Sequence, residues 1–486
     1  MTKNQILKKY FGYDTFREGQ EEVIDGILSG RDVLGIMPTG AGKSLCYQIP
    51  ALMMGGITLV ISPLISLMKD QVSALNQAGI LAAYLNSSLT VNQYYKVLNL
   101  AKTGRYPIIY VAPERLLNEE FLDFALHVDI SMVAVDEAHC VSQWGQDFRP
   151  SYLNIKDFVA LLPKRPIVSA FTATATDKVK RDIIKELELK SPYTITTGYN
   201  RKNLYFAVKR PYEKMAETIK ILNSHRDESG IIYCISRKAV DELEYYLSLK
   251  GYSVAKYHAG LGDMERKHNQ EAFIQGDKNI MVATNAFGMG IDKPDVRYVL
   301  HYNMPKSMEA YYQEAGRAGR DGKPAQCIML YSQQDYRTNE FLINLVDENE
   351  TLTQDEKDDI KAREMYKLDK MQAYALSRRC LREYILNYFG ESAEPDCKYC
   401  SNCLKSGNIK GYTPTADRLL YKKLKAITIE IAKHEHIPSY SVVNDSVLMN
   451  MAIKKPKTIE ELKKVEGMGS YKVKKYGEIY LRIIRE

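Results

Sequence analysis

Two short segments of this sequence carry residues that can handle a nucleoside triphosphate. The first, Met37–Ser44, is a glycine-rich turn that ends in a lysine and a serine. Glycines allow such a turn to point its backbone N–H groups at phosphates, the lysine can reach the β and γ phosphates, and the serine hydroxyl can bind Mg²⁺. The residues that we expect around the phosphates are Thr39, Gly40, Ala41, Gly42, Lys43 and Ser44.

The second segment, Val133–His139, is an apolar run that ends in Asp136 and Glu137. Asp136 can hold Mg²⁺, directly or through water, and Glu137 can polarise an attacking water molecule. Taken singly, the glycine turn could arise by chance, and the two acids could be a solvated pair at a strand end. Because they occur in this order, each after a buried-strand pattern, they predict nucleotide hydrolysis.

Short apolar runs predict the α/β fold that would position these segments. Residues 31–176 alternate such runs with helical patterns, and the runs are continuous, which suits a parallel sheet covered on both faces. A second series predicts a second α/β domain that lacks a lysine loop. The runs are Asp32–Met37, Ile57–Ser62, Ile108–Ala112, Met132–Asp136 and Ile167–Thr172, then Gly230–Ile235, Ser253–Tyr257, Asn279–Thr284, Arg297–Tyr302 and Gln326–Tyr331.

The composition sets further limits. The chain has 486 residues, of which 45% are hydrophobic and 26% charged, as in ordinary globular proteins. No run approaches the ~20 apolar residues of a membrane helix, and the N-terminus lacks the apolar stretch of a signal peptide. We therefore expect a cytoplasmic protein without membrane attachment. The net charge of +7 permits a polyanionic partner without identifying one.

The eight cysteines form two groups. Cys46, Cys140, Cys234 and Cys327 are scattered beside apolar runs, as small buried hydrophobic residues often are. Cys380, Cys397, Cys400 and Cys403 are clustered. Four thiolates suit tetrahedral Zn²⁺, and an iron–sulfur cluster is the rival because four thiolates also hold one. Disulfides are not expected in a cytosolic chain. With no open coordination position, the metal should stabilise the fold rather than catalyse.

The acids and the residues after them resemble the RecQ family of DNA helicases within helicase superfamily two. The resemblance rests first on Asp136–Pro150 and covers about residues 5–405 before it resumes near the C-terminus. The short phosphate loop, with Met37 where the longer pattern has glycine, is a known variant in helicase-like ATPases. Other matching segments are Ser62–Gln71 (motif Ia), Ala112–Arg115 (motif Ib), Thr172–Ala175 (motif III), Ala283–Asp292 (motif V) and Tyr312–Arg320 (motif VI).

The resemblance implies two tandem RecA-like lobes and ATP-driven movement 3′ to 5′ along single-stranded DNA, with strand separation, in recombination, repair and replication. It assigns the adenine contacts to Tyr13, Arg17 and Gln20. From chemistry alone, core packing of the neighbouring Phe11 and Phe16 explains that segment equally well. In motif VI the resemblance implies catalytic roles for Gln313, Arg317 and Arg320, with Arg320 as the arginine finger that reaches the γ-phosphate.

For DNA, the resemblance points to the aromatic-rich loop Trp144–Tyr152 and to motifs Ia, Ib, IV and V. Flat side chains offer bases a stacking surface, and Ser, Thr and Arg suit phosphate contacts that ignore base sequence. Trp144 could instead be a core residue. The DNA contacts that we expect are Ser62, Lys69, Arg115, Trp144, Phe148, Arg149, Ser236, Arg237 and Thr284.

The last part of the chain, Leu419–Arg485, resembles an HRDC domain, a helical accessory module. Its Gly467–Gly469 turn could present amides to a phosphate, or the domain could show only a solvated face. His434 and His436 are expected to be surface residues. About a dozen residues separate Cys403 from this domain, which is too few for the winged helix that RecQ proteins often carry, so duplex separation is in question.

We therefore expect an α/β protein with two lobes, a helical zinc-binding module and an all-α HRDC domain. The expected boundaries are 1–198, 199–335, 336–406, a linker at 407–414, and 415–486. Expected cofactors are ATP, Mg²⁺ and Zn²⁺. Expected partners are single-stranded and branched DNA, with single-stranded DNA-binding protein by resemblance only, and a nucleoid-associated monomer is expected.

Two other functions stay open. The first is an RNA helicase or RNA-stimulated ATPase, against which the aromatic loop and the cysteine cluster argue. The second is a DNA-stimulated ATPase that remodels or anneals DNA without unwinding it, which the missing winged helix favours.

Overall fold

The computed structural model describes residues 1–287, 293–349, 351–404, 418–435, 437, 439–465 and 467–485. The chain divides into two compact units, which are described separately. The first unit joins residues 1–198 with residues 414–486, and the second is formed by residues 199–413. Within the described ranges, no helix is both long and apolar enough to span a membrane.

The first unit is built on a parallel sheet of seven strands in the order β3-β4-β2-β5-β6-β1-β7. Every residue of β1, β2 and β4 is buried, as expected for a sheet that helices cover on both faces. The strands are β1 (Val33–Ile36), β2 (Ile57–Ile61), β3 (Ala82–Leu85), β4 (Ile108–Val111), β5 (Ile130–Val135), β6 (Ile167–Thr172) and β7 (Tyr193–Thr196). The sequence predicted five of them, and β3 and β7 were missed.

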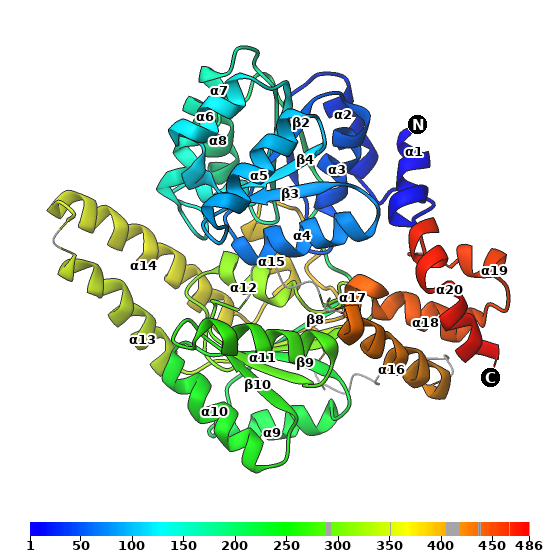
Figure 1. Cartoon of the computed structure of the whole chain (residues 1–486). Helices are drawn as coiled ribbons and strands as arrows, with labels where there is room; N and C mark the ends of the chain where they lie inside the picture. Colours follow the sequence, from blue (N-terminus) through cyan, green and yellow to red (C-terminus); the bar gives the residue numbers. More distant parts are fainter. Residues whose placement is uncertain are drawn as a thin grey trace. The chain divides into compact units, whose positions relative to one another are not determined.

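Three helical segments precede β1, and further helices and short helical turns connect the strands (Figure 1). The order alternates strand and helix, so the connections are the crossovers that parallel pairing requires. They are α1 (Lys3–Ile6), η1 (Leu7–Phe11), α2 (Gln20–Leu28), α3 (Lys43–Met53), α4 (Ile65–Gln77), α5 (Val91–Lys102), η2 (Pro113–Arg115), α6 (Glu119–Leu126), η3 (Ala138–Val141), η4 (Pro150–Leu153), α7 (Asn154–Leu161) and α8 (Asp177–Glu186).

The second unit contains a parallel sheet of six strands in the order β10-β11-β9-β12-β13-β8. The predicted second α/β domain is confirmed, with β8 as a strand that the sequence did not indicate. The strands are β8 (Leu204–Lys209), β9 (Ser229–Tyr233), β10 (Val254–Tyr257), β11 (Ile280–Ala283), β12 (Val296–His301) and β13 (Ala325–Leu330), and the helices are α9 (Lys214–Ser224), α10 (Arg237–Leu249), α11 (Asp263–Gln275) and α12 (Met308–Ala315).

A helical module completes the second unit. Helices α13 and α14 lie side by side as a long pair (Figure 1), and the module reaches the edge strand β8, where Ser401 N–H donates to the Phe206 carbonyl at 2.9 Å. This contact covers an otherwise open sheet edge. The elements are α13 (Gln333–Asn344), η5 (Leu345–Glu348), α14 (Gln354–Leu376) and α15 (Leu381–Tyr388).

The C-terminal part of the first unit is all helical, with its own apolar core around Leu424, Leu448 and Tyr480. Its elements are α16 (Arg418–Glu435), α17 (Ser439–Val442), α18 (Asp445–Lys454), α19 (Ile459–Lys463) and α20 (Ser470–Arg485). The expected linker at 407–414 and His436 lie outside the described residues, whereas His434 is exposed.

A glycine contact joins this helical part to the N-terminal segment of the same unit. The Gly467 N–H donates to the Gly12 carbonyl at 3.0 Å. A Cβ atom at Gly12 would lie 2.4 Å from the Gly469 nitrogen, so a side chain there would collide with backbone. Gly12 and Gly467 both have positive φ, which glycine adopts without strain. The two ends of the sequence therefore meet in one unit.

Candidate active site

The glycine turn lies between β1 and α3. Gly40 and Gly42 have φ of 83° and 79°, the left-handed region that favours glycine. A Cβ atom at Gly42 would lie 2.5 Å from Gln20 Nε2. Helix α3 begins at Lys43, so the positive end of the helix faces the turn. Lys43 Nζ donates to the Met37 carbonyl at 3.1 Å, which holds the ammonium group over the turn.

The two acids follow β5, two strands away from β1 in the sheet. Asp136 is buried, and Glu137 has a φ of 49°, a strained value for a residue with a side chain. Parallel strands end at the same edge of a sheet, so the acids and the glycine turn share that edge. This is where the fold is expected to hold a nucleotide and its metal ion.

Burial controls the charge of the first acid. Desolvation and, to a smaller extent, the neighbouring Glu137 raise the pKa of Asp136 to about 7, although the Lys43 ammonium opposes the rise. A bound divalent cation would favour the ionised form in the same way as Lys43 does. The ionised form of Asp136 is therefore unfavourable in the free protein, and a bound cation would stabilise it.

His139 connects the turn that carries the acids to motif III. His139 Nδ1 lies 3.3 Å from Glu137 Oε2 and 2.9 Å from Thr172 Oγ1 at the end of β6. Burial lowers the pKa of His139, so the neutral imidazole is favoured. Tyr152 donates its hydroxyl to the Asp136 carbonyl at 2.9 Å. The acid-bearing turn is thus fixed by side chains from two later segments of the chain.

The predicted adenine residues are engaged with the phosphate turn. Gln20 is buried, its Oε1 accepts from the Arg17 N–H at 2.8 Å, and its Nε2 donates to the Ala41 carbonyl at 2.9 Å. The Arg17 guanidinium donates to the Gly40 carbonyl. Tyr13 is partly buried and packs against an apolar cluster of Ile6, Leu7, Ile24 and Ile49. Adenine binding by Gln20 would require its amide to exchange these partners.

The aromatic loop is fixed but not buried. Trp144 is partly exposed, so it is not the core residue that the sequence left open, and the Lys178 ammonium lies 3.5 Å from its ring centroid. Arg149 pairs with Asp147 at 3.0 Å and donates to the Pro63 carbonyl of motif Ia at 3.0 Å. Arg149 therefore ties the aromatic loop to motif Ia.

The other predicted DNA contacts differ in accessibility. Lys69 is exposed and Phe148 and Arg115 are partly exposed, but Ser62 is fully buried, so its hydroxyl does not face solvent. In the second unit, Ser236 and Arg237 are exposed at the start of α10, where Ser236 caps the helix and the helix dipole favours phosphate. Thr284 is mostly buried after β11. The remainder of motif V, residues 288–292, lies outside the described residues.

Motif VI spans the end of α12 and the turn after it. Gln313 and Arg317 are buried, Arg320 is partly exposed, and Gln313 Nε2 has no hydrogen-bond partner among the described residues. Gly319 has a φ of 56°, and a Cβ atom there would lie 2.5 Å from Asn203 Nδ2.

Two residues that the sequence analysis missed brace this turn. The Arg201 guanidinium donates to the carbonyls of Ala318 and Gly319 at 3.0 and 2.8 Å. Asn203 Nδ2 donates to the Gly319 carbonyl at 2.9 Å. Both precede β8, far from motif VI in sequence, and their only sequence signal was a polar stretch between the two lobes.

The cysteine cluster has the geometry of a metal site. The four Sγ atoms of Cys380, Cys397, Cys400 and Cys403 all lie within 4.8 Å of one another. Ligands at about 2.3 Å from a tetrahedral zinc ion are spaced by about 3.8 Å, so the cluster fits one Zn²⁺. Four sulfurs this close leave room for a single ion, which argues against an iron–sulfur cluster.

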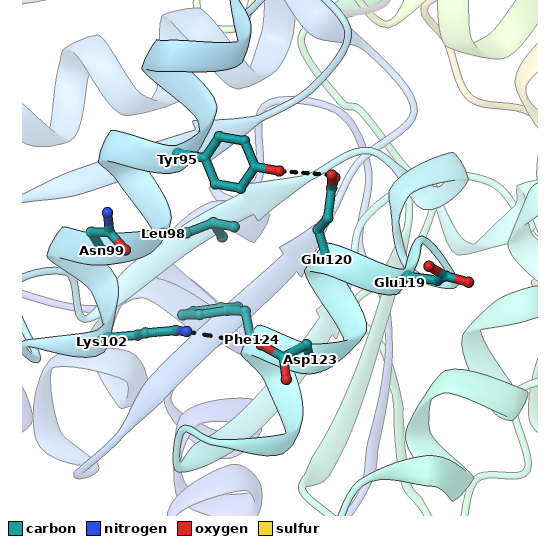
Figure 2. Close-up of a pocket in the computed structure, with 8 residues that line it drawn as sticks. All are labelled: Tyr95, Leu98, Asn99, Lys102, Glu119, Glu120, Asp123 and Phe124. Carbon is teal, nitrogen blue, oxygen red and sulfur yellow. Dashed lines mark hydrogen bonds and ion pairs between the residues drawn. The ribbon is translucent and has the colours of Figure 1, made fainter.

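A separate hollow of about 350 Å³ lies between α5 and α6 (Figure 2). Its floor is apolar, with Leu98 and Phe124. Its polar rim is paired internally, since Tyr95 donates to Glu120 at 2.7 Å and Lys102 lies 3.9 Å from Asp123. No predicted site residue lines it.

Comparisons with known proteins cover most of the chain. Residues 17–182 match the DEAD/DEAH box helicase family, 213–322 the helicase conserved C-terminal domain, 333–404 the RecQ zinc-binding family and 417–484 the HRDC domain.

ATP-dependent DNA helicase RecQ of Bacillus subtilis is 46% identical over 416 residues, which cover 85% of this chain and 69% of that protein. Probable ATP-dependent DNA helicase RecS of the same organism is 37% identical over 461 residues, covering 83% and 92%. The chain spans between 62% and 69% of the length of three bacterial RecQ proteins.

Solved structures show the same fold. The crystal structure of the DUF1998 helicase MrfA bound to DNA has a TM-score of 0.58 at 19% identity, and it covers 71% of this chain and 53% of that chain.

Proposed function

Because this chain belongs to the RecQ family of helicases, we propose that it is an ATP-dependent DNA helicase that moves 3′ to 5′ along single-stranded DNA. One observation carries the proposal: the Gly40–Ser44 turn and the Asp136–Glu137 pair lie at the same edge of one parallel sheet. This arrangement supports triphosphate hydrolysis, and the RecQ zinc-binding and HRDC matches favour DNA over RNA as the activating polymer.

The proposed roles in the first unit follow from chemistry. The backbone N–H groups of residues 39–44 and the Lys43 ammonium bind the β and γ phosphates. Ser44 and Asp136 would hold Mg²⁺, which supplies charge neutralisation at the phosphates when bound. Glu137 orients and polarises the attacking water. Its Oε2 lies 3.3 Å from the imidazole of the buried His139.

In the second unit we assign catalytic roles to Gln313, Arg317 and Arg320, with Arg320 as the arginine finger. The unpartnered amide of Gln313 supports the assignment, since a buried polar group without a partner is expected to acquire one in the working state. The proposal requires these side chains to reach the nucleotide during the cycle.

On the DNA side we propose that exposed cations and the aromatic loop hold a single strand. The accessible candidates are Lys69, Arg115, Trp144, Phe148, Arg149, Ser236 and Arg237. Stacking on Trp144 and Phe148 would contribute about 1–3 kcal/mol per base, and the cations would contact phosphates without sequence preference. Burial of Ser62 and Thr284 argues that any role they have uses backbone groups.

A second candidate function rests on the spacing of the family matches. The zinc-binding match ends at residue 404 and the HRDC match begins at residue 417, which leaves no room for a winged helix between them. The candidate is a DNA-stimulated ATPase that remodels or anneals DNA with weak unwinding. We also propose the domain boundaries given above, a monomeric state, and single-stranded DNA-binding protein as a partner.

The test is strand displacement from fluorescent partial duplexes with either a 3′ or a 5′ single-stranded tail, with ATPase recorded in parallel. Displacement only from the 3′ tail supports the helicase. ATPase stimulation by DNA without displacement supports the second candidate. Stimulation by single-stranded RNA and not by DNA would contradict both, and Lys43→Ala serves as the inactive control.

A further inference from the structure

One buried hydroxyl in the second unit joins two helicase motifs. Tyr233 is the last residue of β9 and is 3% exposed. Its hydroxyl donates to the Phe287 carbonyl of motif V at 2.8 Å. The Arg317 side chain of motif VI lies close enough to the same hydroxyl to act on its charge. A phenol can donate once and accept as well, so both contacts are satisfied together.

The ring of Tyr233 packs on a second link to motif VI. It stacks on the His301 imidazole with ring centroids 5.5 Å apart and an interplanar angle of 23°. His301 is fully buried, and its Nε2 lies 2.9 Å from Glu314 Oε2. Glu314 lies on α12, three residues before Arg317. The hydroxyl of Tyr233 therefore contacts motif V at Phe287, and its ring packs on His301, which contacts motif VI at Glu314.

The usual role of a buried tyrosine is packing, with a hydroxyl that finds the nearest backbone partner. Tyr298 on the adjacent strand β12 illustrates that role, because it is 1% exposed and its hydroxyl has no hydrogen-bond partner among the described residues. Tyr233 differs, since both partners of its hydroxyl belong to functional motifs. Burial raises the pKa of Tyr233, and the positive charges of Arg317 and Arg320 oppose that rise.

We propose that Tyr233 is a positioning residue of the motor, which holds Arg317 in its working orientation and ties it to the motif V backbone at Phe287. The inference rests on the proposed function and deepens it. If DNA binding shifts Phe287, the hydrogen bond from the Tyr233 hydroxyl to the Phe287 carbonyl must move or break. The position of Arg317 then depends on whether DNA is bound. Because Tyr233 is buried, it acts through these two residues and not on a substrate directly.

The first test compares two matched variants of the full chain, Tyr233→Phe and Tyr298→Phe. Each keeps the ring and removes one buried hydroxyl. With saturating single-stranded DNA, Tyr233→Phe is expected to lower kcat for ATP about 5–20-fold, with KM and DNA affinity within about twofold of the parent. Tyr298→Phe is expected to leave kcat unchanged. Equal kcat in Tyr233→Phe and the parent, or a loss explained by a lowered melting temperature, overturns the proposal.

The second test is a double-mutant cycle with Arg317→Lys, read in single-turnover reactions because that background is slow. If Tyr233 acts through the Arg317 guanidinium, Tyr233→Phe adds less than about twofold in the Arg317→Lys background. A full multiplicative effect in both backgrounds means a general packing role and overturns the proposal. A parent protein without DNA-stimulated ATPase would refute the proposed function itself, and that result is seen before any variant is compared.

Discussion

The two parallel sheets hold their functional groups in different ways. In the first, the groups sit on backbone of unusual conformation: Gly40 and Gly42 have positive φ, and so does Glu137. In the second, the functional side chains sit on backbone with negative φ, apart from Gly319 in the turn, and distant residues brace them. Arg201 holds the carbonyls after α12, and Tyr233 contacts Arg317.

The difference follows from what each site has to offer a ligand. A phosphate cradle is made of backbone N–H groups, so its local sequence must contain glycines and its helix must begin at a set residue. An arginine that acts on developing charge must be aimed, and aiming a long side chain takes buried partners from several segments. The following predictions distinguish loss of phosphate binding in the first sheet from loss of arginine positioning in the second.

The largest effect is expected from Lys43→Ala in the cradle. Turnover should fall to background, because the site loses the cation that binds the phosphates and offsets the charge of Asp136. DNA binding, measured by fluorescence anisotropy, should remain within about threefold of the parent. Lys185→Ala, at an exposed lysine of α8, is the control. Normal turnover in Lys43→Ala would remove the cradle from the catalytic site.

Arg320→Ala should lower kcat about 10³-fold while the affinity for a fluorescent ATP analogue stays within about threefold. The reason is that an arginine finger acts on charge that develops during the reaction. The control is Arg337→Ala in α13, outside motif VI. Loss of ATP affinity with an unchanged kcat would mean that Arg320 binds ATP in the ground state. The proposed difference between phosphate binding by the glycine turn and transition-state stabilisation by Arg320 would then be wrong.

Cys397→Ser should lower the melting temperature of the second unit by about 10 °C and reduce bound zinc to well below one ion per chain. The cluster anchors the module to β8 through Ser401 and Phe206, so the second sheet depends on it. Cys327→Ala, at a buried thiol outside the cluster, is the control for metal content. A full zinc complement in Cys397→Ser would show that this residue is not a ligand.

The smallest effect is a gain in stability. Asp136 has a folded-state pKa of about 7 against an unfolded value of 3.8, so the unfolded chain ionises first and stability is lost as pH rises from 3.8 through 7. Asp136→Asn removes this loss. Without nucleotide or metal ion, the variant should be more stable than the parent at pH 8 by at most about 4 kcal/mol, and by less at pH 5, while hydrolysis is lost. Calorimetry at both pH values measures the gap, and a gap that does not widen with pH would contradict the raised pKa.

The sequence predicted the parts of the molecule whose chemistry is local. The glycine turn, the acids after β5 and the four clustered cysteines each carry their signal in a few adjacent residues, and the structure brings the last set within 4.8 Å. The continuous apolar runs likewise predicted most central strands, because burial on both faces leaves a strong pattern.

The parts that the sequence did not predict depend on distant partners. Strands β3, β7 and β8 lie at sheet edges. Burial is partial in β7, but Leu204–Ala207 of β8 are buried and form an apolar run that the sequence analysis overlooked. Arg201 and Asn203 donate hydrogen bonds to the motif VI turn, and this role is evident only from the three-dimensional structure. The family resemblance assigned Gln20 to adenine, and in this structure its amide is bonded to the phosphate turn, a partner that no local pattern indicates.

The contact between Gly12 and Gly467 has a consequence for synthesis on the ribosome. Residues 1–198 emerge first, and the residues that complete their unit follow only after the whole of 199–413 has been made. At about 5–20 residues per second, the nascent first sheet spends tens of seconds with Gly12 uncovered. The unit that begins first is therefore finished last, and its N-terminal part must persist as an incomplete fold while the inserted unit is translated.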